Sequence, residues 1–414
     1  MIEFVKHRLP NGMVVLIHRD SQTPMAVTNL VYNAGSKYDP PEMTGMAHLF
    51  EHMMFGGSKN AGDFDIPQQL AGGENNAYTN SDITNYYQIL PGENLETALW
   101  LESDRMGHLD LKTKVFATQK AIVLEEYKET CLNEPYGDVW HYLHDLCYKS
   151  YPYRWPTIGM TPAHIESITL DELKKFYRRY YHPANAVLAI TGNVDIDQTL
   201  KMVEKWFLDL KPSDLELPIF KPEEEQREKR GKKIKGLVPH HAVYMAFHIP
   251  NKLNTRFPAI DLLSDLLGLG RSCWLNEVLV EEKEIFSSVD AYVNGSNDTG
   301  LFIIEGRLNP GFTAEEGEAS IVEVLNKTKN QRISERELRK LQNTFLTSHA
   351  FSSLSSLHKA MNLSQYENLG NANLLNTEVE EYQSVTPENI RSEAELIFRE
   401  ENCSVVWYSP ASPG

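Results

Sequence analysis

Two histidines and a glutamate stand close together in the segment His48-Leu49-Phe50-Glu51-His52. A helix over residues 47–55 would bring His48 and His52, four positions apart, to the same face, so that both imidazoles could bind one metal ion. Glu51 would lie beside them, where its carboxylate could take a proton from metal-bound water without being a ligand. The spacing predicts a catalytic zinc site. The alternative is a helix whose histidines are core residues without a metal.

A catalytic zinc needs a third protein ligand, commonly a carboxylate distant in sequence, with water in the fourth position. The helix expected over residues 118–130 carries three candidates after an apolar run: Glu125, Glu126 and Glu129. Helical periodicity does not choose among them, because a solvated helix face explains each one singly. The third ligand therefore stays open at this point.

The four cysteines form no C-x-x-C pair, so a structural zinc site made of cysteines is not expected. They are too few and too scattered for a disulfide framework, which favours a reducing compartment. His141, His144 and Cys147 have the spacing of one helix face, but a surface helix with incidental histidines is the simpler interpretation.

The composition is that of a globular protein, with 41% hydrophobic and 23% charged residues in a chain of 414. A net charge of -17 argues against binding to nucleic acid, which needs basic residues to neutralise phosphates. It suits basic peptide substrates, although simple solubility explains it at least as well. The apolar stretches are of strand length, so no membrane span is expected. Met1 runs into Ile2-Glu3-Phe4-Val5 without a signal-peptide pattern, and we expect a cytoplasmic or periplasmic location.

Hydrophobic patterns predict strands over residues 13–18, 25–33, 83–90 and 185–191, and helices over residues 93–106, 113–131 and 170–181. The pattern around residues 87–92 returns at 304–311, and that of 176–190 returns at 398–407. We expect an α+β fold with two homologous domains, each a mixed or antiparallel sheet with helices packed mainly on one face. The alternative is a chance likeness of generic patterns. The predicted parts are a zinc-binding catalytic domain (1–210), a charged linker (211–236) and a homologous non-catalytic domain (237–414).

Several further motifs carry a family resemblance. They are Leu9-Pro10-Asn11-Gly12, Ala34-Gly35-Ser36, the segment 45–55 around the histidines, Asn76-Ala77-Tyr78-Thr79, Glu102-Ser103-Asp104-Arg105-Met106 and Val123-Leu124-Glu125-Glu126. Together they resemble the pitrilysin, insulysin and mitochondrial processing peptidase family of zinc peptidases over nearly the whole chain. The resemblance implies that Glu126 is the third ligand and that Gln119 replaces a glutamate that the family carries near the metal.

The resemblance also implies that Asn76 and Ala77 present backbone and amide groups to a peptide substrate. A flexible turn that enters an edge strand explains the Gly and Asn residues of this segment equally well. An exposed edge strand would let an extended peptide add to the sheet.

One departure from the family concerns an Arg and a Tyr, seven positions apart, that bind the substrate carbonyl in active members. The matching positions here are Val280 and Ser287, which supply neither a charge nor a phenol. The sequence resembles the zinc-bearing subunit of a two-chain bacterial type. We therefore expect an endopeptidase that needs a homologous partner subunit in a heterodimer, or a homodimer, for full activity. The alternative is a non-hydrolytic peptide-binding or assembly subunit.

Overall fold

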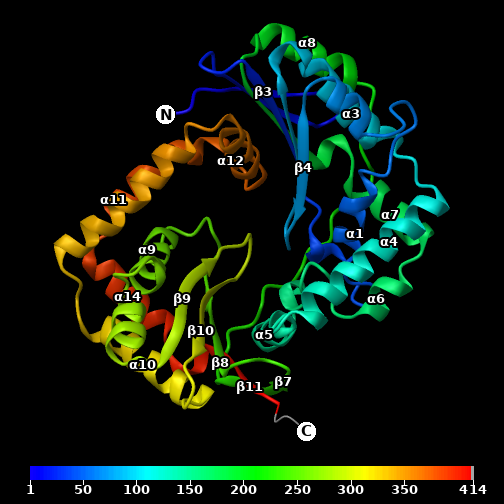
Figure 1. Cartoon of the computed structure of the whole chain (residues 1–414). Helices are drawn as coiled ribbons and strands as arrows, with labels where there is room; N and C mark the ends of the chain where they lie inside the picture. The colour runs from blue at the N-terminus through cyan, green and yellow to red at the C-terminus, as the bar shows by residue number, and fades with distance from the viewer. Residues whose placement is uncertain (412–414) are drawn as a thin grey trace. The chain divides into compact units, whose positions relative to one another are not determined.

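The computed structural model describes residues 1–411, which form two compact units. Unit 1 consists of Met1–Tyr127, Trp155–Ile219 and His349–Thr377. Unit 2 consists of Lys128–Arg154, Phe220–Ser348 and the described chain from Glu378 onward. Figure 1 labels the helices and strands of both units.

Unit 1 is built on a six-stranded mixed sheet in the order β1-β2-β6-β3-β5-β4. Its strands are β1 (Val5–Arg8), β2 (Val14–Arg19), β3 (Met25–Tyr32), β4 (Glu74–Thr79), β5 (Thr84–Pro91) and β6 (Ala186–Gly192). β2 and β6 run parallel, and every other neighbouring pair is antiparallel. β4 stands last in this order, so one of its edges has no neighbouring strand in the described sheet.

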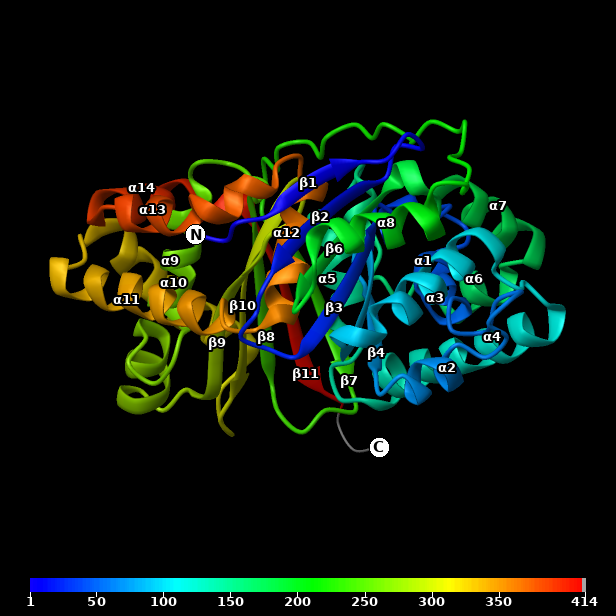
Figure 2. The same ribbon diagram turned by 90° about the horizontal axis from the view of Figure 1, so that it is seen from above.

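Helices lie on both faces of this sheet, because strands such as β6 have buried residues pointing to both sides. Val187 and Ala189 of β6 pack against Ala360 and Leu363 of α12 (Ser356–Asn368). Figure 2 shows α12 and α8 on opposite sides of β6 and β3. The other helices of unit 1 are α1 (Met46–Met53), α2 (Asp65–Leu70), α3 (Leu95–His108), α4 (Thr113–Tyr127), α6 (Pro162–Ser167), α7 (Leu170–Tyr180) and α8 (Ile196–Phe207).

Unit 2 is built on a five-stranded sheet in the order β7-β11-β8-β10-β9. Its strands are β7 (Arg230–Gly236), β8 (Ala242–Ile249), β9 (Phe286–Asn294), β10 (Gly300–Leu308) and β11 (Cys403–Pro410). A large apolar core joins one face to helices α9 (Phe257–Gly268), α10 (Ala314–Asn330) and α14 (Pro387–Ile397). On the other face, Leu143 of α5 (Val139–Cys147) belongs to a cluster with Tyr244 and Val406.

Two more helices complete the chain: α11 (Glu335–Ser352) and α13 (Glu378–Ser384). None of the helices in residues 1–411 has the length and apolarity to cross a membrane.

The two sheets repeat one topology. β7 runs parallel to β11, as β2 does to β6. The remaining pairs of unit 2, β11 with β8, β8 with β10 and β10 with β9, are antiparallel, like the matching pairs β6 with β3, β3 with β5 and β5 with β4. The predicted α+β fold with two homologous domains is confirmed.

The compact units do not follow the continuous domain ranges 1–210 and 237–414. Helix α5 comes from the first range and packs on the sheet of unit 2, whereas α12 comes from the second range and packs on the sheet of unit 1. An apolar helix face shows that a helix is buried but not which sheet buries it. The linker range 211–236 also differs from the structure, because residues 230–236 form strand β7 at an edge of the second sheet.

Candidate active site

Helix α1, which carries the histidine motif, is held at its N-terminus by a buried carboxylate. Asp39 accepts hydrogen bonds from the Gly45 N–H at 2.7 Å and from the Ala47 N–H at 2.9 Å. These donors have no partner inside the helix, so the carboxylate fulfils the role of an N-cap. Burial raises the pKa of Asp39 to about 8, against the lowering effect of the backbone donors. Gly45 itself has a φ of 92°, a left-handed conformation that favours glycine.

The apolar residues of α1 fix which side of the helix is exposed. Met46, Leu49, Phe50 and Met53 are buried in the core of unit 1. The histidines lie on the less buried side, with 14% of the His48 side chain and 24% of the His52 side chain exposed. The apolar stripe therefore directs both imidazoles toward α4 and away from the core.

Glu126 of α4 completes a group of three metal-ligating side chains. Its Oε1 lies 3.7 Å from His48 Nε2, and its Oε2 lies 3.5 Å from His52 Nε2. One ligand atom from each of the three residues lies within 4.8 Å of the other two. Two imidazole nitrogens and one carboxylate, brought together from two helices, form a donor set that suits catalytic zinc. The structure thus brings Glu126 to the histidines, and this group includes neither Glu125 nor Glu129.

The charges around this group favour metal binding. Burial holds the pKa of His48 below its usual value, although the neighbouring Glu126 carboxylate opposes that effect. Hydrogen bonding to His52 lowers the pKa of Glu126. A neutral imidazole and an ionised carboxylate are the forms that bind a metal cation, so these two shifts prepare the ligands at neutral pH.

Glu51 lies between the histidines in sequence, but its carboxylate has a different partner. Glu51 Oε2 accepts a hydrogen bond of 2.5 Å from the hydroxyl of Thr79, the last residue of β4. Burial raises the pKa of Glu51, and the Thr79 hydrogen bond acts in the opposite direction. A partly buried carboxylate with a raised pKa suits a general base beside a metal.

The two residues expected to contact substrate, Asn76 and Ala77, lie on β4. Their position at the edge of the sheet leaves backbone groups unpaired by any described strand. The Ala77 N–H points away from β5 and donates to the side-chain oxygen of Asn76 at 2.8 Å. Gln119 lies seven positions before Glu126, two turns earlier on the same face of α4, and is partly exposed.

In unit 2, the two positions that depart from the family pattern have structural roles. Val280 packs against the large apolar core. The Ser287 hydroxyl donates to the backbone carbonyl of Arg307 at 3.1 Å. Neither side chain supplies a cation or a phenol.

The second metal group considered from spacing is not assembled. In the described residues, the metal-ligating cluster consists of His48, His52 and Glu126, and the histidines of α5 are not part of any such group. We also expected a surface helix there, which is wrong, since His141 and Cys147 are buried against the sheet of unit 2. Burial lowers the pKa of His144 to about 4, and its Nδ1 lies 2.9 Å from the Tyr153 carbonyl oxygen.

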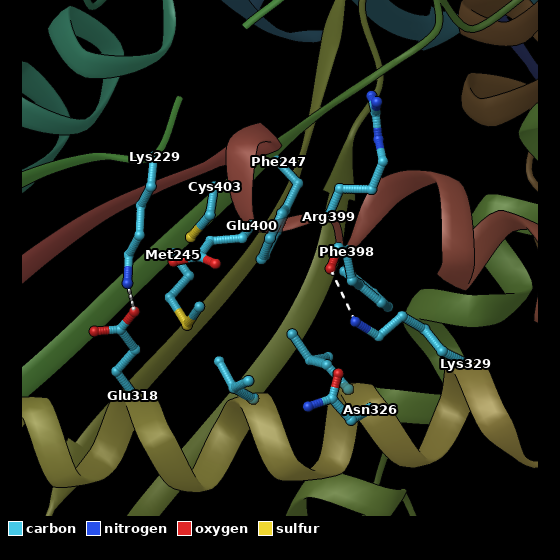
Figure 3. Close-up of a pocket in the computed structure, with 12 residues that line it drawn as sticks. Lys229, Met245, Phe247, Glu318, Asn326, Lys329, Phe398, Arg399, Glu400 and Cys403 are labelled. Carbon is cyan, nitrogen blue, oxygen red and sulfur yellow. Dashed lines mark hydrogen bonds and ion pairs between the residues drawn. The ribbon is translucent and has the colours of Figure 1, made fainter. Parts of the chain in front are cut away.

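A cavity of about 330 Å³ lies in unit 2 between α10, β8 and the chain around β11. Figure 3 shows Lys229 paired with Glu318 on one side and Lys329 directed at the Phe398 carbonyl on the other. None of its lining residues belongs to the histidine and glutamate group, so it is a separate feature of the fold.

Sequence reasoning missed the roles of Asp39 and Thr79. Asp39 precedes the helix by seven positions, so no local capping pattern predicts it. Thr79 belongs to a motif that carries the family resemblance, but only the folded sheet brings its hydroxyl to Glu51.

Comparison with known proteins identifies the family. Residues 14–160 match the family described as "Insulinase (Peptidase family M16)", and residues 167–345 match "Peptidase M16 inactive domain". The chain is 32% identical to zinc protease PqqE of Helicobacter pylori over 340 residues, which cover 81% of this chain and 76% of the relative. The chain belongs to the peptidase M16 family of zinc proteases.

Two other relatives extend the comparison. The crystal structure of a protease from Helicobacter pylori is 27% identical, with a TM-score of 0.95 over 99% of this chain and 100% of that one. The mitochondrial-processing peptidase subunit beta of Caenorhabditis elegans is 29% identical over 216 residues, or 52% of this chain and 46% of that protein. Within this M16 chain, the segment that matches the inactive domain contains no second His-x-x-Glu-His motif.

Proposed function

We propose that this M16 chain is a zinc endopeptidase that hydrolyses peptides or unfolded segments, with His48, His52 and Glu126 as zinc ligands and Glu51 as general base. The observation that carries the proposal is the approach of one ligand atom from each of the three residues to within 4.8 Å, with Glu51 on the same helix as the histidines. Such a His₂Glu donor set leaves a fourth position for water.

Zinc bound at this site would lower the pKa of its water and polarise the substrate carbonyl. Glu51 Oε2 is already occupied by the Thr79 hydroxyl, so Oε1 is the oxygen that accepts the proton of the attacking water. Glu51 then returns this proton to the nitrogen of the leaving amine, which completes the cleavage of the peptide bond. The partial burial of Glu51 supports this role, because a raised pKa makes the carboxylate a better proton acceptor.

The substrate, in this proposal, binds as an extended strand along β4. The Ala77 N–H faces the free edge of the sheet and is satisfied only locally, by the Asn76 side chain. A carbonyl oxygen of the peptide could replace the Asn76 side-chain oxygen as the acceptor of the Ala77 N–H. The Asn76 side-chain amide would then be free to form hydrogen bonds with the peptide backbone. Gln119 lies two turns, or about 10 Å along the axis, before Glu126 on α4, and we propose that it contributes only to the surroundings of the metal.

We further propose that full activity needs a homologous partner subunit in a heterodimer, because a homodimer of this chain would only repeat Val280 and Ser287. The support is the chemistry of Val280 and Ser287, which cannot provide the positive charge and the phenol that stabilise a developing oxyanion. A relative named as a subunit, the mitochondrial-processing peptidase subunit beta, agrees with a two-chain arrangement.

The test is hydrolysis of a library of quenched peptides by the purified, zinc-loaded chain, with and without its nearest homologous subunit from the same source. We expect activity that depends on the partner. Full activity without a partner would refute the divided site. No cleavage in either case, together with measurable peptide binding, would favour a non-hydrolytic peptide-binding or assembly subunit.

A further inference from the structure

The hydrogen bond between Thr79 and Glu51 links strand β4, which is proposed to bind the substrate, to helix α1, which carries the proposed general base. Thr79 is the last residue of β4, the edge strand, and Glu51 lies on α1, the helix with the histidines. The Thr79 Oγ1 lies 2.5 Å from Glu51 Oε2, the distance of a strong hydrogen bond to a charged acceptor.

The protons around Thr79 can be counted. Thr84 lies opposite Thr79 in the sheet and donates its single hydroxyl proton to the Ala34 carbonyl at 2.6 Å. The Tyr181 hydroxyl donates in turn to Thr84 Oγ1 at 3.2 Å. Thr84 therefore has no proton to give to Thr79.

The Thr79 proton has two acceptors within reach: the Glu51 carboxylate at 2.5 Å and Thr84 Oγ1 at 3.2 Å. The shorter distance and the negative charge both favour the carboxylate. Thr84 is buried and its proton is already used, so the Thr79 hydroxyl donates its own proton to the Glu51 carboxylate.

We propose that Thr79 is a positioning residue for the general base. It holds Glu51 in one rotamer through Oε2 and leaves Oε1 as the oxygen that exchanges a proton with the attacking water. The inference rests on the proposed function of Glu51. Ala77 is two positions before Thr79 on the same strand, so the strand proposed to bind the peptide also fixes the base.

The first test measures kcat, KM and zinc content of Thr79→Val and Thr79→Ser, with the active partner present where it is needed. T79V keeps the shape but lacks the hydroxyl, and we expect kcat to fall about tenfold to a hundredfold at unchanged KM and zinc content, the usual effect of losing such a supporting hydrogen bond. T79S keeps the donor and should restore kcat to within about threefold of the wild type. T79V with the kcat of the wild type, or T79S as slow as T79V, would overturn the inference.

Thr28→Val is the matched control. Thr28 is a fully buried threonine of β3 whose hydroxyl has no hydrogen-bond partner within residues 1–411, so the same substitution removes an unpaired hydroxyl from the same sheet. T28V should leave kcat unchanged. Thermal unfolding of each variant checks its fold, and Thr79→Ala is the second variant if T79V does not fold.

Two readouts separate a failure of this inference from a failure of the proposed function. Wild-type hydrolysis must be abolished in Glu51→Gln; if it is not, Glu51 is not the base and the proposed function fails. Crystal structures of the wild type and T79V test the positioning role without any activity. We expect the Glu51 carboxylate to leave its wild-type position or to occupy several rotamers in T79V, and an unchanged Glu51 would overturn the inference.

Discussion

Arg105 and Glu102 form an ion pair inside unit 1, with exposed side-chain fractions of 1% and 0%. The Arg105 guanidinium donates from Nε to Oε2 at 2.7 Å and from Nη2 to Oε1 at 2.5 Å. The same Oε1 accepts a hydrogen bond from Gln88 Nε2 at 2.8 Å. The guanidinium also lies 4.5 Å from the ring centre of Phe64 and 4.3 Å from that of Tyr86.

Arg105→Met would leave the Glu102 carboxylate buried with Gln88 as its remaining partner. Removing one member of a buried pair costs about 3–5 kcal/mol of unfolding free energy, because the other charge stays desolvated. Glu102→Leu should cost a similar amount for the same reason. The double variant R105M/E102L replaces both charges by apolar groups, and we expect it to lie within about 2 kcal/mol of the wild type.

The assay is urea unfolding of the wild type, the two single variants and the double variant, followed by far-UV circular dichroism. The expected coupling energy between the two positions is at least about 3 kcal/mol. Lys112→Met is the control, because Lys112 pairs with Asp110 at the surface and its side chain is 69% exposed, so its loss should change stability by less than about 1 kcal/mol. Additive losses in the double variant would refute the conclusion that desolvation dominates this pair.

Three further predictions concern pH, capping and metal. Burial, reinforced by Asp261, raises the pKa of Asp265 to about 7. The folded state therefore holds a proton that the unfolded state releases, and the wild type should lose stability relative to Asp265→Asn as pH rises from about 4 to about 7. In urea unfolding at pH 8 the loss should be about 1–3 kcal/mol, and a difference that does not vary with pH would contradict this. Asp39→Ala removes the acceptor of two N–H groups at the start of α1, including that of Ala47. It should lower the free energy of urea unfolding by about 2–4 kcal/mol, because two buried donors lose their acceptor. A loss below about 0.5 kcal/mol would show that the cap is not needed. Zinc at a hundredfold excess over its Kd should stabilise the wild type by about 2.7 kcal/mol, seen as a higher unfolding temperature, and an equal rise in His48→Ala would place the metal elsewhere.

Local sequence patterns predicted much of unit 1. The expected helix over residues 47–55 is α1, and the expected strands over residues 25–33 and 83–90 are β3 and β5. These elements are set by apolar periodicity within one segment, which is visible without the fold. The approach of His48 to His52 is equally local, because it follows from helical geometry alone.

Features that depend on tertiary structure were not predictable from one segment. Glu125, Glu126 and Glu129 could not be separated by periodicity, and the fold brings Glu126 to the histidines because α4 packs against α1. The packing of α5 on the sheet of unit 2 and of α12 on the sheet of unit 1 was missed, because an apolar helix face does not show which sheet buries it. Strand β7 was taken for part of a linker because an edge strand tolerates charged residues such as Lys232 and Lys233.

The most direct measurement compares peptide hydrolysis and zinc content of the wild type, Glu51→Gln and His48→Ala, each with the homologous subunit present. Glu51→Gln removes the proton acceptor but no zinc ligand, so we expect loss of hydrolysis with zinc content unchanged. His48→Ala should lose both zinc and hydrolysis. Hydrolysis by Glu51→Gln at the wild-type rate, or by His48→Ala without zinc, would contradict the proposed zinc peptidase mechanism.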